Sequence, residues 1–414
     1  MFKKDNPTKV LFLGGSYAQI PILKEARDRG YYLIICDFLP ENPGIRFADE
    51  YHNVSTTDLE EVLKLALKVR PDFIIAYASD PAAPVAAYVS EKMGLPGNPY
   101  SSVRILSEKD LFRNYQRELG LNTPQFCIIT ENDYAEKELS RLSFPYIVKP
   151  TDSSGSKGVT KVTCNAGIAA AISYAFSFSR SKRIIAEEFI DNKLADLHGD
   201  GFVVGGELVF SHLGDHIYNR KSNPFNPIGT MWPSIQSKKI IDEIAKDAAN
   251  IIKSCGFRNG PVNIEARVNS KGKPYIMEIG PRSGGHFVPQ AIFYGTGFNM
   301  VKASLDVMFG KKIILSGQLT KSSAYYAIHS DVNGELMNLA LSARLLPYIE
   351  EFHQYILPGK MVRSFQGAND TLGIILFSFR SHDKMNFIMS NMQDYIELEI
   401  RESVMSPQLD GIFY

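Results

Sequence analysis

The sequence predicts an α/β protein in three parts. A domain with a parallel sheet covers residues 1–100, a two-lobed α+β domain covers residues 101–313 with a small lid lobe at about 125–188, and a small α+β domain covers residues 314–414. Three observations predict this division: strand and helix patterns alternate at the start, a compact α+β pattern follows, and hairpins dominate from Gly201 onward. A chain of 414 residues is long enough for two or three such domains.

The first hundred residues contain continuous apolar strands separated by helices, which is typical of a parallel sheet covered on both faces. The predicted strands are residues 9–13, 31–36 and 73–77. The predicted helices are residues 20–29, 58–69 and 81–93, and glycines end the first and the last of them.

The second part reads as a small α+β layer about the size of a subdomain. We expect one helix over residues 107–119, with Ser107 as its cap, and then a polar, glycine-bearing loop at 151–158. The other predicted elements are strands at 126–130, 146–149, 160–163 and 183–190 and helices at 133–142 and 166–178.

Two hairpins and a long helix follow. Residues 202–204 and 207–213 flank Gly205-Gly206, and residues 262–269 and 273–279 flank Ser270-Lys271-Gly272, which are both turn sequences. Further elements are predicted at 238–254 (helix), 324–329 and 373–379 (strands) and 383–392 (helix).

Charge and cysteine content exclude several classes of partner. The chain has 45 basic and 45 acidic residues, so no bulk positive field attracts nucleic acid or an anionic membrane, and we expect neither as a partner. The apolar run at 10–13 is too short for a signal-peptide core, and no run reaches the length of a membrane span. Four cysteines without a C-x-x-C pair argue against disulfides and thiolate metal sites and favour a cytoplasmic protein.

The loop after Lys149 contains the residue types that bind phosphate. Small residues let the backbone approach an anion closely, and successive N–H groups can cradle it. Lys149 and Lys157 add positive charge, although the P-loop spacing is absent. The alternative is a surface loop with two solvated lysines.

Two glutamates lie inside the otherwise apolar strands of the second hairpin. Antiparallel pairing around residues 270–272 places Glu265 and Glu278 across from or diagonal to each other, where they repel unless a cation lies between them. Carboxylates together with phosphate oxygens commonly hold Mg²⁺. Arg282 follows closely and is placed to stabilise charge on a transferred phosphoryl group or an oxyanion. The alternative is a pair of edge glutamates that face water.

Together with the strand Ile184-Ile185-Ala186-Glu187-Glu188-Phe189-Ile190, these motifs resemble the ATP-grasp superfamily over residues 1–310. The order of the motifs carries the resemblance more than any single motif does. The first part, with Gly14-Gly15-Ser16 and Asp37, resembles the pre-ATP-grasp domain of biotin carboxylase and carbamoyl-phosphate synthetase.

The resemblance implies a complete ATP site. Lys109 and Lys149 would contact the phosphates, Glu187 would accept from the adenine amino group, and Asp196 would bind the ribose. Glu265 and Glu278 would ligate Mg²⁺ or Mn²⁺. The implied loop over the phosphates and the implied backbone contacts to the adenine ring are Ser154, Gly155, Ser156, Lys157, Gly158, Glu188, Phe189 and Ile190.

One position departs from the family pattern. Many members read Glu-x-Asn at the second metal strand, but here Gly280 takes the place of the Asn. The sequence Glu278-Ile279-Gly280-Pro281-Arg282 is closer to the amino-acid ligase branch, in which the equivalent arginine faces the acyl-phosphate centre. We therefore expect Arg282 to be catalytic.

The implied activity is that of an ATP-dependent ligase. A carboxylate attacks the γ-phosphorus of ATP, and an amine or a related nucleophile then attacks the acyl phosphate, so that ADP and phosphate are formed. The cofactors are ATP and Mg²⁺, and the substrate is expected to be amino-acid-like. Candidate substrate residues, each with a structural role as the alternative, are His198, Arg220, Gly284, Gly285 and His286.

Other functions stay open at this point. Within the superfamily they are a bicarbonate-activating carboxylase and a purine-pathway enzyme. A nicotinamide-dependent oxidoreductase is disfavoured because Gly14-Gly15-Ser16 lacks the G-x-G-x-x-G spacing. A nucleotide-binding protein without catalysis is kept open by Gly280. A homodimer formed through the first part or the tail is a further candidate, and residues 314–414 carry no motif that assigns a role.

Overall fold

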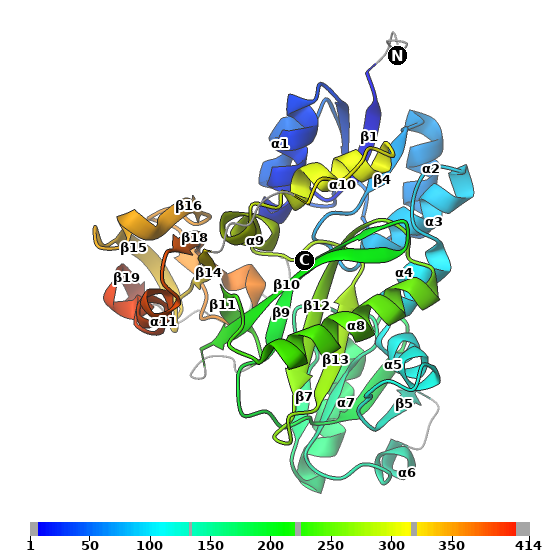
Figure 1. Ribbon diagram of the computed structural model, residues 1–414, viewed down its shortest axis with the longest axis vertical. Helices are drawn as coiled ribbons and strands as arrows, with labels where there is room; N and C mark the ends of the chain where they lie inside the picture. The colour runs from blue at the N-terminus through cyan, green and yellow to red at the C-terminus, as the bar shows by residue number, and fades with distance from the viewer. Residues whose placement is uncertain (1–6, 132–134, 220–224, 316–320, 403–414) are drawn as a thin grey trace. The chain divides into compact units, whose positions relative to one another are not determined.

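The computed structural model describes residues 7–131, 135–219, 225–315 and 321–402 (Figure 1). It divides into two compact units. Unit 1 comprises Met1–Leu213, Ile235–Pro289 and Phe298–Ser316, and unit 2 comprises Gly214–Ser234, Gln290–Gly297 and Gly317–Tyr414. Among the helices in these described ranges, none is long and apolar enough to cross a membrane.

Unit 1 begins with the predicted parallel sheet, whose strand order is β3-β2-β1-β4. Alternate residues of β1 join different apolar clusters, Leu11 and Leu13 in one and Val10 and Phe12 in the other, so the sheet is covered on both faces. The α/β prediction for this part is confirmed. The bounds are β1 (Lys9–Leu13), α1 (Ile20–Asp28), β2 (Tyr32–Cys36), β3 (Glu50–His52), α2 (Leu59–Val69), β4 (Phe73–Ile75) and α3 (Ala83–Met93).

The helix predicted over residues 107–119 is α5 (Lys109–Glu118). A further helix, α4 (Tyr100–Ser107), was not predicted and ends directly before it. Ser107 is the last residue of α4, so its assignment as a cap was wrong. The break lies at Glu108, whose extended backbone (φ −95°, ψ 116°) separates the helices. Lys109 therefore begins a helix, and its backbone N–H donates to Thr151 O at 3.0 Å.

The lid lobe is an antiparallel sheet of order β5-β8-β6-β7 with an apolar core. Cys127, Val148, Ile184 and Ala186 pack in that core with Ala171 and Ala175 of α7. The bounds are β5 (Phe126–Thr130), α6 (Ala135–Leu139), β6 (Tyr146–Pro150), β7 (Thr160–Val162), α7 (Ile168–Ser177) and β8 (Arg183–Glu188).

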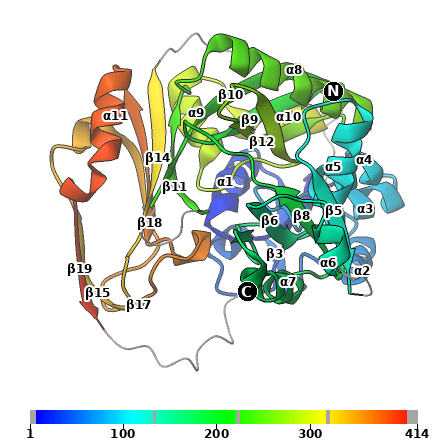
Figure 2. The ribbon, with the colours of Figure 1, turned by 90° about the horizontal axis from the view of Figure 1, so that it is seen from below.

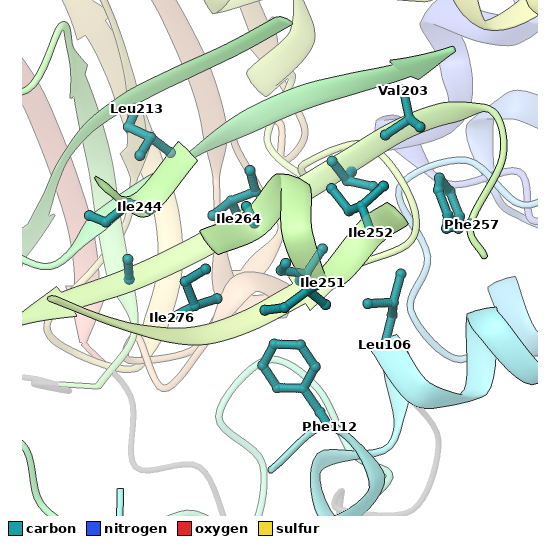
Figure 3. Packing of buried hydrophobic residues seen from close by; sticks show 14 of the residues in the cluster. Leu106, Phe112, Val203, Leu213, Ile244, Ile251, Ile252, Phe257, Ile264 and Ile276 are labelled. Carbon is teal, nitrogen blue, oxygen red and sulfur yellow. The ribbon is translucent and has the colours of Figure 1, made fainter. Parts of the chain in front are cut away.

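The second lobe of unit 1 is an antiparallel sheet in which β12 lies between β13 and β9, and β9 pairs with β10. Figure 3 shows Ile244, Ile251 and Ile252 of α8 packed over Ile264 and Ile276 of the sheet. Leu106 of α4 and Phe112 of α5 join the same cluster, which fixes the start of α5 against the sheet. The bounds are β9 (Leu197–Val204), β10 (Glu207–Tyr218, passing into unit 2 at Gly214), α8 (Lys238–Cys255), β12 (Gly260–Val268), β13 (Pro274–Gly280) and α10 (Met300–Met308).

Unit 2 contains the strand order β10-β11-β14-β18-β16 and a three-stranded sheet β17-β15-β19. Met385, Ile388 and Met389 of α11 share its apolar core, and α11 packs against β14 and β18 (Figure 2). The bounds are β11 (Pro227–Trp232), α9 (Val288–Thr296), β14 (Ser322–Ile328), β15 (Gly334–Leu341), β16 (Ile349–Gln354), β17 (Met361–Val362), β18 (Gly373–Phe379), α11 (His382–Ser390) and β19 (Ile396–Glu402).

Candidate active site

Glu265 and Glu278 face each other across the β12–β13 pair. Their Cα atoms are register partners, and a β-bulge follows directly after Glu265. Burial and the charge of Glu278 raise the pKa of Glu265 to about 7, because neither effect favours a second negative charge there. Two half-buried carboxylates in this arrangement fit a divalent cation, since a bound cation removes the repulsion and uses oxygen ligands.

Lys109 connects these acids to the glycine-bearing loop. Its Nζ donates to Ser153 O at 2.8 Å and lies 3.4 Å from Glu278 Oε2. The position follows from the start of α5 at Lys109, which the backbone bond to Thr151 holds beside the loop. The ammonium group is thus placed between the loop and the carboxylate pair.

A buried ion-pair network lies in and beside the lid lobe. The Glu187 carboxylate of β8 contacts Lys149 Nζ of β6 and accepts from Arg113 Nε of α5 at 3.0 Å. Arg113 is fully buried and also donates to Gln116 Oε1 at 2.9 Å. Burial opposes ionisation of Glu187, but the charges of Arg113 and Lys149 outweigh it and lower the pKa to about 2. Burial also lowers the pKa of Lys149.

The network gives Arg113 a role that the sequence did not suggest. Arg113 follows Lys109 by one helical turn on α5. This spacing is the only local feature of the sequence that places the two side chains on one face of the helix. Since both oxygens of Glu187 already contact cations, adenine recognition by this side chain stays a prediction.

The strand end beyond Glu187 uses several backbone groups internally. Glu188 N donates to Gln125 O at 2.8 Å, and Phe189 N donates to Pro145 O at 3.3 Å. The Phe189 ring lies near two cations, with Lys161 Nζ at 3.6 Å and Arg267 Cζ at 5.3 Å from its centroid.

Arg267 also holds the residue predicted to bind ribose. Its Nε donates to Asp196 Oδ1 at 2.7 Å, Asn192 Nδ2 donates to the same oxygen at 2.6 Å, and Arg267 Nη1 reaches Ile190 O at 3.3 Å. Arg267 follows Glu265 by two residues on β12, so both side chains point to one face of the strand. The structure thus brings Asp196 near the predicted adenine strand, and its contact with ribose stays a prediction.

The glycine-bearing loop has a base that is held by hydrogen bonds, and several of its residues have a left-handed backbone. Asp152 Oδ2 accepts from Ser181 N at 2.7 Å, and Arg180 Nη2 donates to Asp152 O at 2.7 Å. Positive φ values occur at Gly155 (65°), Ser156 (57°) and Gly158 (72°). A Cβ atom at position 158 would lie 2.8 Å from Pro150 Cγ, so only glycine fits there without displacement. Ser154 is half-buried, and Lys157 is exposed.

Arg282 pairs with an acid that the sequence analysis did not identify. Its Nε donates to Asp80 Oδ1 at 2.6 Å and its Nη2 donates to Asp80 Oδ2 at 2.7 Å. Asp80 lies between β4 and α3 of the N-terminal sheet, in Ser79-Asp80-Pro81, which matches no motif.

Buried polar contacts hold the segment after Arg282. Gly284 N donates to both oxygens of Asp200, at 3.0 and 2.9 Å, and Asn263 Nδ2 donates to Asp200 Oδ1 at 2.8 Å. His198 Nε2 lies 2.9 Å from Asn263 Nδ2 in the same network. Burial raises the pKa of Asp200 to about 6.

The three other candidate substrate residues are His286, Gly285 and Arg220. His286 has a positive φ of 53°, and burial lowers its pKa to about 4. Gly285 has open space where a Cβ would be. Arg220 lies outside the described residues.

A cavity of about 410 Å³ is lined in part by Glu278. Asp80, Lys109, Ser153, Glu278 and Gly280 line it on the side of the predicted metal site. Its lining includes four acidic and four basic side chains in all. The cavity therefore offers partners for both signs of charge next to the predicted phosphate site.

Comparisons with known proteins show a domain match and a shared fold. The ATP-grasp domain family matches residues 142–290. The carbamoyl phosphate synthase large chain of Thermoanaerobacter sp. (strain X514) is 25% identical over 301 residues, which are 72% of this chain but only 27% of that protein. The chain thus spans about a quarter of the length of this relative.

Two solved structures share the fold over nearly the whole chain. The L-amino acid ligase from Bacillus licheniformis has a TM-score of 0.78 at 19% identity, covering 96% of this chain and 100% of that one. The biotin carboxylase domain of Hydrogenobacter thermophilus 2-oxoglutarate carboxylase, solved with MgADP and bicarbonate, has a TM-score of 0.74 at 14% identity, covering 95% and 91%. Residues 142–290 are thus similar to an ATP-grasp domain, and the chain shares its fold with these two solved structures.

Proposed function

We propose that this protein is an ATP-dependent ligase that joins a carboxylate to an amine or a related nucleophile through an acyl phosphate, with release of ADP and phosphate. One observation carries the proposal: Glu265 and Glu278 face each other in register, beside the Lys109 ammonium group. Neither a structural ion pair nor a solvated edge explains two acids placed in this way, because like charges directly opposite each other are destabilising.

ATP and Mg²⁺ are the cofactors of the superfamily, and this chain has residues that fit both. Glu265 and Glu278 would hold Mg²⁺, which supplies charge neutralisation at the phosphates when it is bound. Lys109 and Lys149 would orient the phosphates, and Arg282 would offset negative charge at the acyl centre. Closure of the loop at 153–158 would exclude water that otherwise hydrolyses the acyl phosphate.

An amino-acid-like substrate is supported by two observations. The L-amino acid ligase from Bacillus licheniformis shares the fold across 96% of this chain. The cavity beside Glu278 is lined by acidic and basic side chains in equal number, which suits a small zwitterion. The assignments of Glu187, Asp196 and His286 to adenine, ribose and substrate remain part of this proposal.

The alternative functions lead to different expectations. The Asp37 carboxylate accepts from Gly15 N at 2.6 Å, Leu39 N at 2.8 Å and Asn42 Nδ2 at 2.8 Å, so it is already engaged within its own loop region. This argues against Asp37 as a ribose-binding acid of a dinucleotide site. Carboxylase and purine-pathway chemistry differ from the proposal only in the substrate.

An ADP-release screen tests the proposal. The protein is incubated with MgATP and panels of amino acids, other carboxylates and bicarbonate, with and without amines. We expect ADP and phosphate in equal amounts with a carboxylate plus an amine, and hydroxylamine is expected to trap the acyl phosphate as a hydroxamate. Glu278→Ala should abolish release. Turnover with bicarbonate alone, or full activity of Glu278→Ala, would contradict the proposal.

A further inference from the structure

The side chain of Arg282 is held by Asp80, which lies between β4 and α3. Asp80 accepts two hydrogen bonds from it in the side-on geometry typical of strong arginine–carboxylate pairs. Both side chains are largely buried, with 11% of Arg282 and 24% of Asp80 exposed. The contact joins residues that are 202 positions apart in the sequence.

The pair occupies the space beside Gly280. A Cβ atom at position 280 would lie 3.0 Å from Asp80 Oδ1 and 3.2 Å from both Cζ and Nε of Arg282. Because side chains two residues apart on a strand share a face, this space is on the side of Glu278. Asp80, Lys109, Glu278 and Gly280 also line one cavity. The Asp80 carboxylate thus stands where a side chain at position 280 would project.

Asp80 leaves a defined set of donors on Arg282. A guanidinium group has five N–H donors. Asp80 takes two of them, and Nη1 donates to Ser283 O at 3.1 Å. Among the residues that the structure describes, no acceptor is assigned to the other two donors, so they can bind a ligand. The charges of Glu278 and Asp200 also attract Arg282. The two hydrogen bonds to Asp80 therefore set the orientation of the guanidinium group among these acids.

We propose that Asp80 is a positioning residue for Arg282 and that Gly280 is required to admit it. In this chain, a carboxylate from the segment between β4 and α3 takes the place of the side chain that many ATP-grasp proteins carry after the second metal-binding glutamate. It fixes Arg282 with two N–H donors directed away from Asp80, ready for the developing charge of the acyl phosphate. This inference rests on the proposed function.

A cycle of variants tests the inference in the full-length protein. Asp80→Ala removes the partner of Arg282, and Gly280→Asn displaces it by steric conflict. Each should lower kcat by 10- to 100-fold, with the affinity for MgADP, measured by calorimetry, within threefold of wild type. The double variant Asp80→Ala/Gly280→Asn should recover at least tenfold over either single variant, because the Asn side chain fits the vacated space and its oxygen accepts from Arg282.

A matched control and a spectroscopic measurement complete the design. Asp49→Asn disrupts another Asp–Arg pair of the same domain, with Arg27, and should leave kcat unchanged. The Nε–H resonance of Arg282, assigned from its loss in Arg282→Lys, should be shifted downfield in wild type and lose that shift in Asp80→Asn.

The outcomes separate this inference from the proposed function. A wild-type kcat in Asp80→Ala would overturn the positioning role. So would a double variant whose kcat is no higher than the product of the two single effects predicts. If no substrate gives ADP release, the proposed function fails. The resonance then decides the Asp80–Arg282 contact alone: an unchanged signal in Asp80→Asn refutes it, and a lost downfield shift supports it.

Discussion

Replacement of Glu265 by glutamine is expected to stabilise the metal-free protein and to abolish its stabilisation by Mg²⁺. No hydrogen bond or ion pair is assigned to the Glu265 carboxylate among the residues that the structure describes, whereas Glu278 lies directly across the strand pair. The charge therefore opposes folding in the absence of a cation. Glutamine keeps the shape and removes the charge.

The magnitude follows from the pKa. Burial and then Glu278 raise the pKa of Glu265 from 4.5 to about 7, which corresponds to at most about 3 kcal/mol of opposition to the charged form. Glu265 is half-buried, so residual solvation reduces this figure. Because the folded state binds the proton more tightly than the unfolded state does, wild-type stability should fall as the pH rises from about 4.5 to about 7. The glutamine variant should lack this fall.

Thermal unfolding in EDTA and in Mg²⁺, from pH 5 to pH 8, checks the prediction. At pH 8 in EDTA, Glu265→Gln should unfold a few degrees above wild type, and the difference should vanish near pH 5. Added Mg²⁺ at ten times its Kd should stabilise wild type by about 1.4 kcal/mol and leave the variant unchanged. Glu397→Gln, at an exposed position of β19, controls for the loss of one charge. A variant that is less stable than wild type in EDTA, or that keeps the wild-type response to Mg²⁺, would refute the reasoning.

Three further predictions concern the loop and the buried acid. Lys109→Ala should free the loop at 153–158 from Glu278, which limited proteolysis would report as faster cleavage there, with at least a tenfold loss of ADP release. Unchanged cleavage would contradict this role. Gly158→Ala should cost about 1–2 kcal/mol in the free energy of unfolding, because the residue has a positive φ and the added Cβ meets Pro150; denaturant titration measures it, and a neutral effect would argue against the loop geometry. Burial raises the pKa of Asp200 from 3.8 to about 6, so it should contribute a fall in stability between pH 4 and pH 6 that Asp200→Asn removes; an identical pH profile in the variant would count against the shift.

Local patterns predicted much of the fold and the centre of the candidate site. Apolar runs and turn residues predicted β1, α8 and β18 within one or two residues, since these signals lie inside each element. The short turn predicted that the strands of Glu265 and Glu278 pair, so that the two acids lie near each other. Their direct opposition depends on the β-bulge after Glu265, which shifts the register. The helix α4 was not predicted, although α5, which follows it after Glu108, was.

The partners of the charged groups were decided only by the tertiary structure. The contacts Asp80–Arg282, Arg113–Glu187 and Asp196–Arg267 join residues that are 202, 74 and 71 positions apart. No spacing rule connects such residues, since their approach depends on how whole sheets and helices pack. The sequence by itself determined the two acids, the two lysines and the loop of the ATP site, because each stands in a local motif. Packing decided which cation neutralises which acid, because charges pair with the neighbours that the folded chain brings near them.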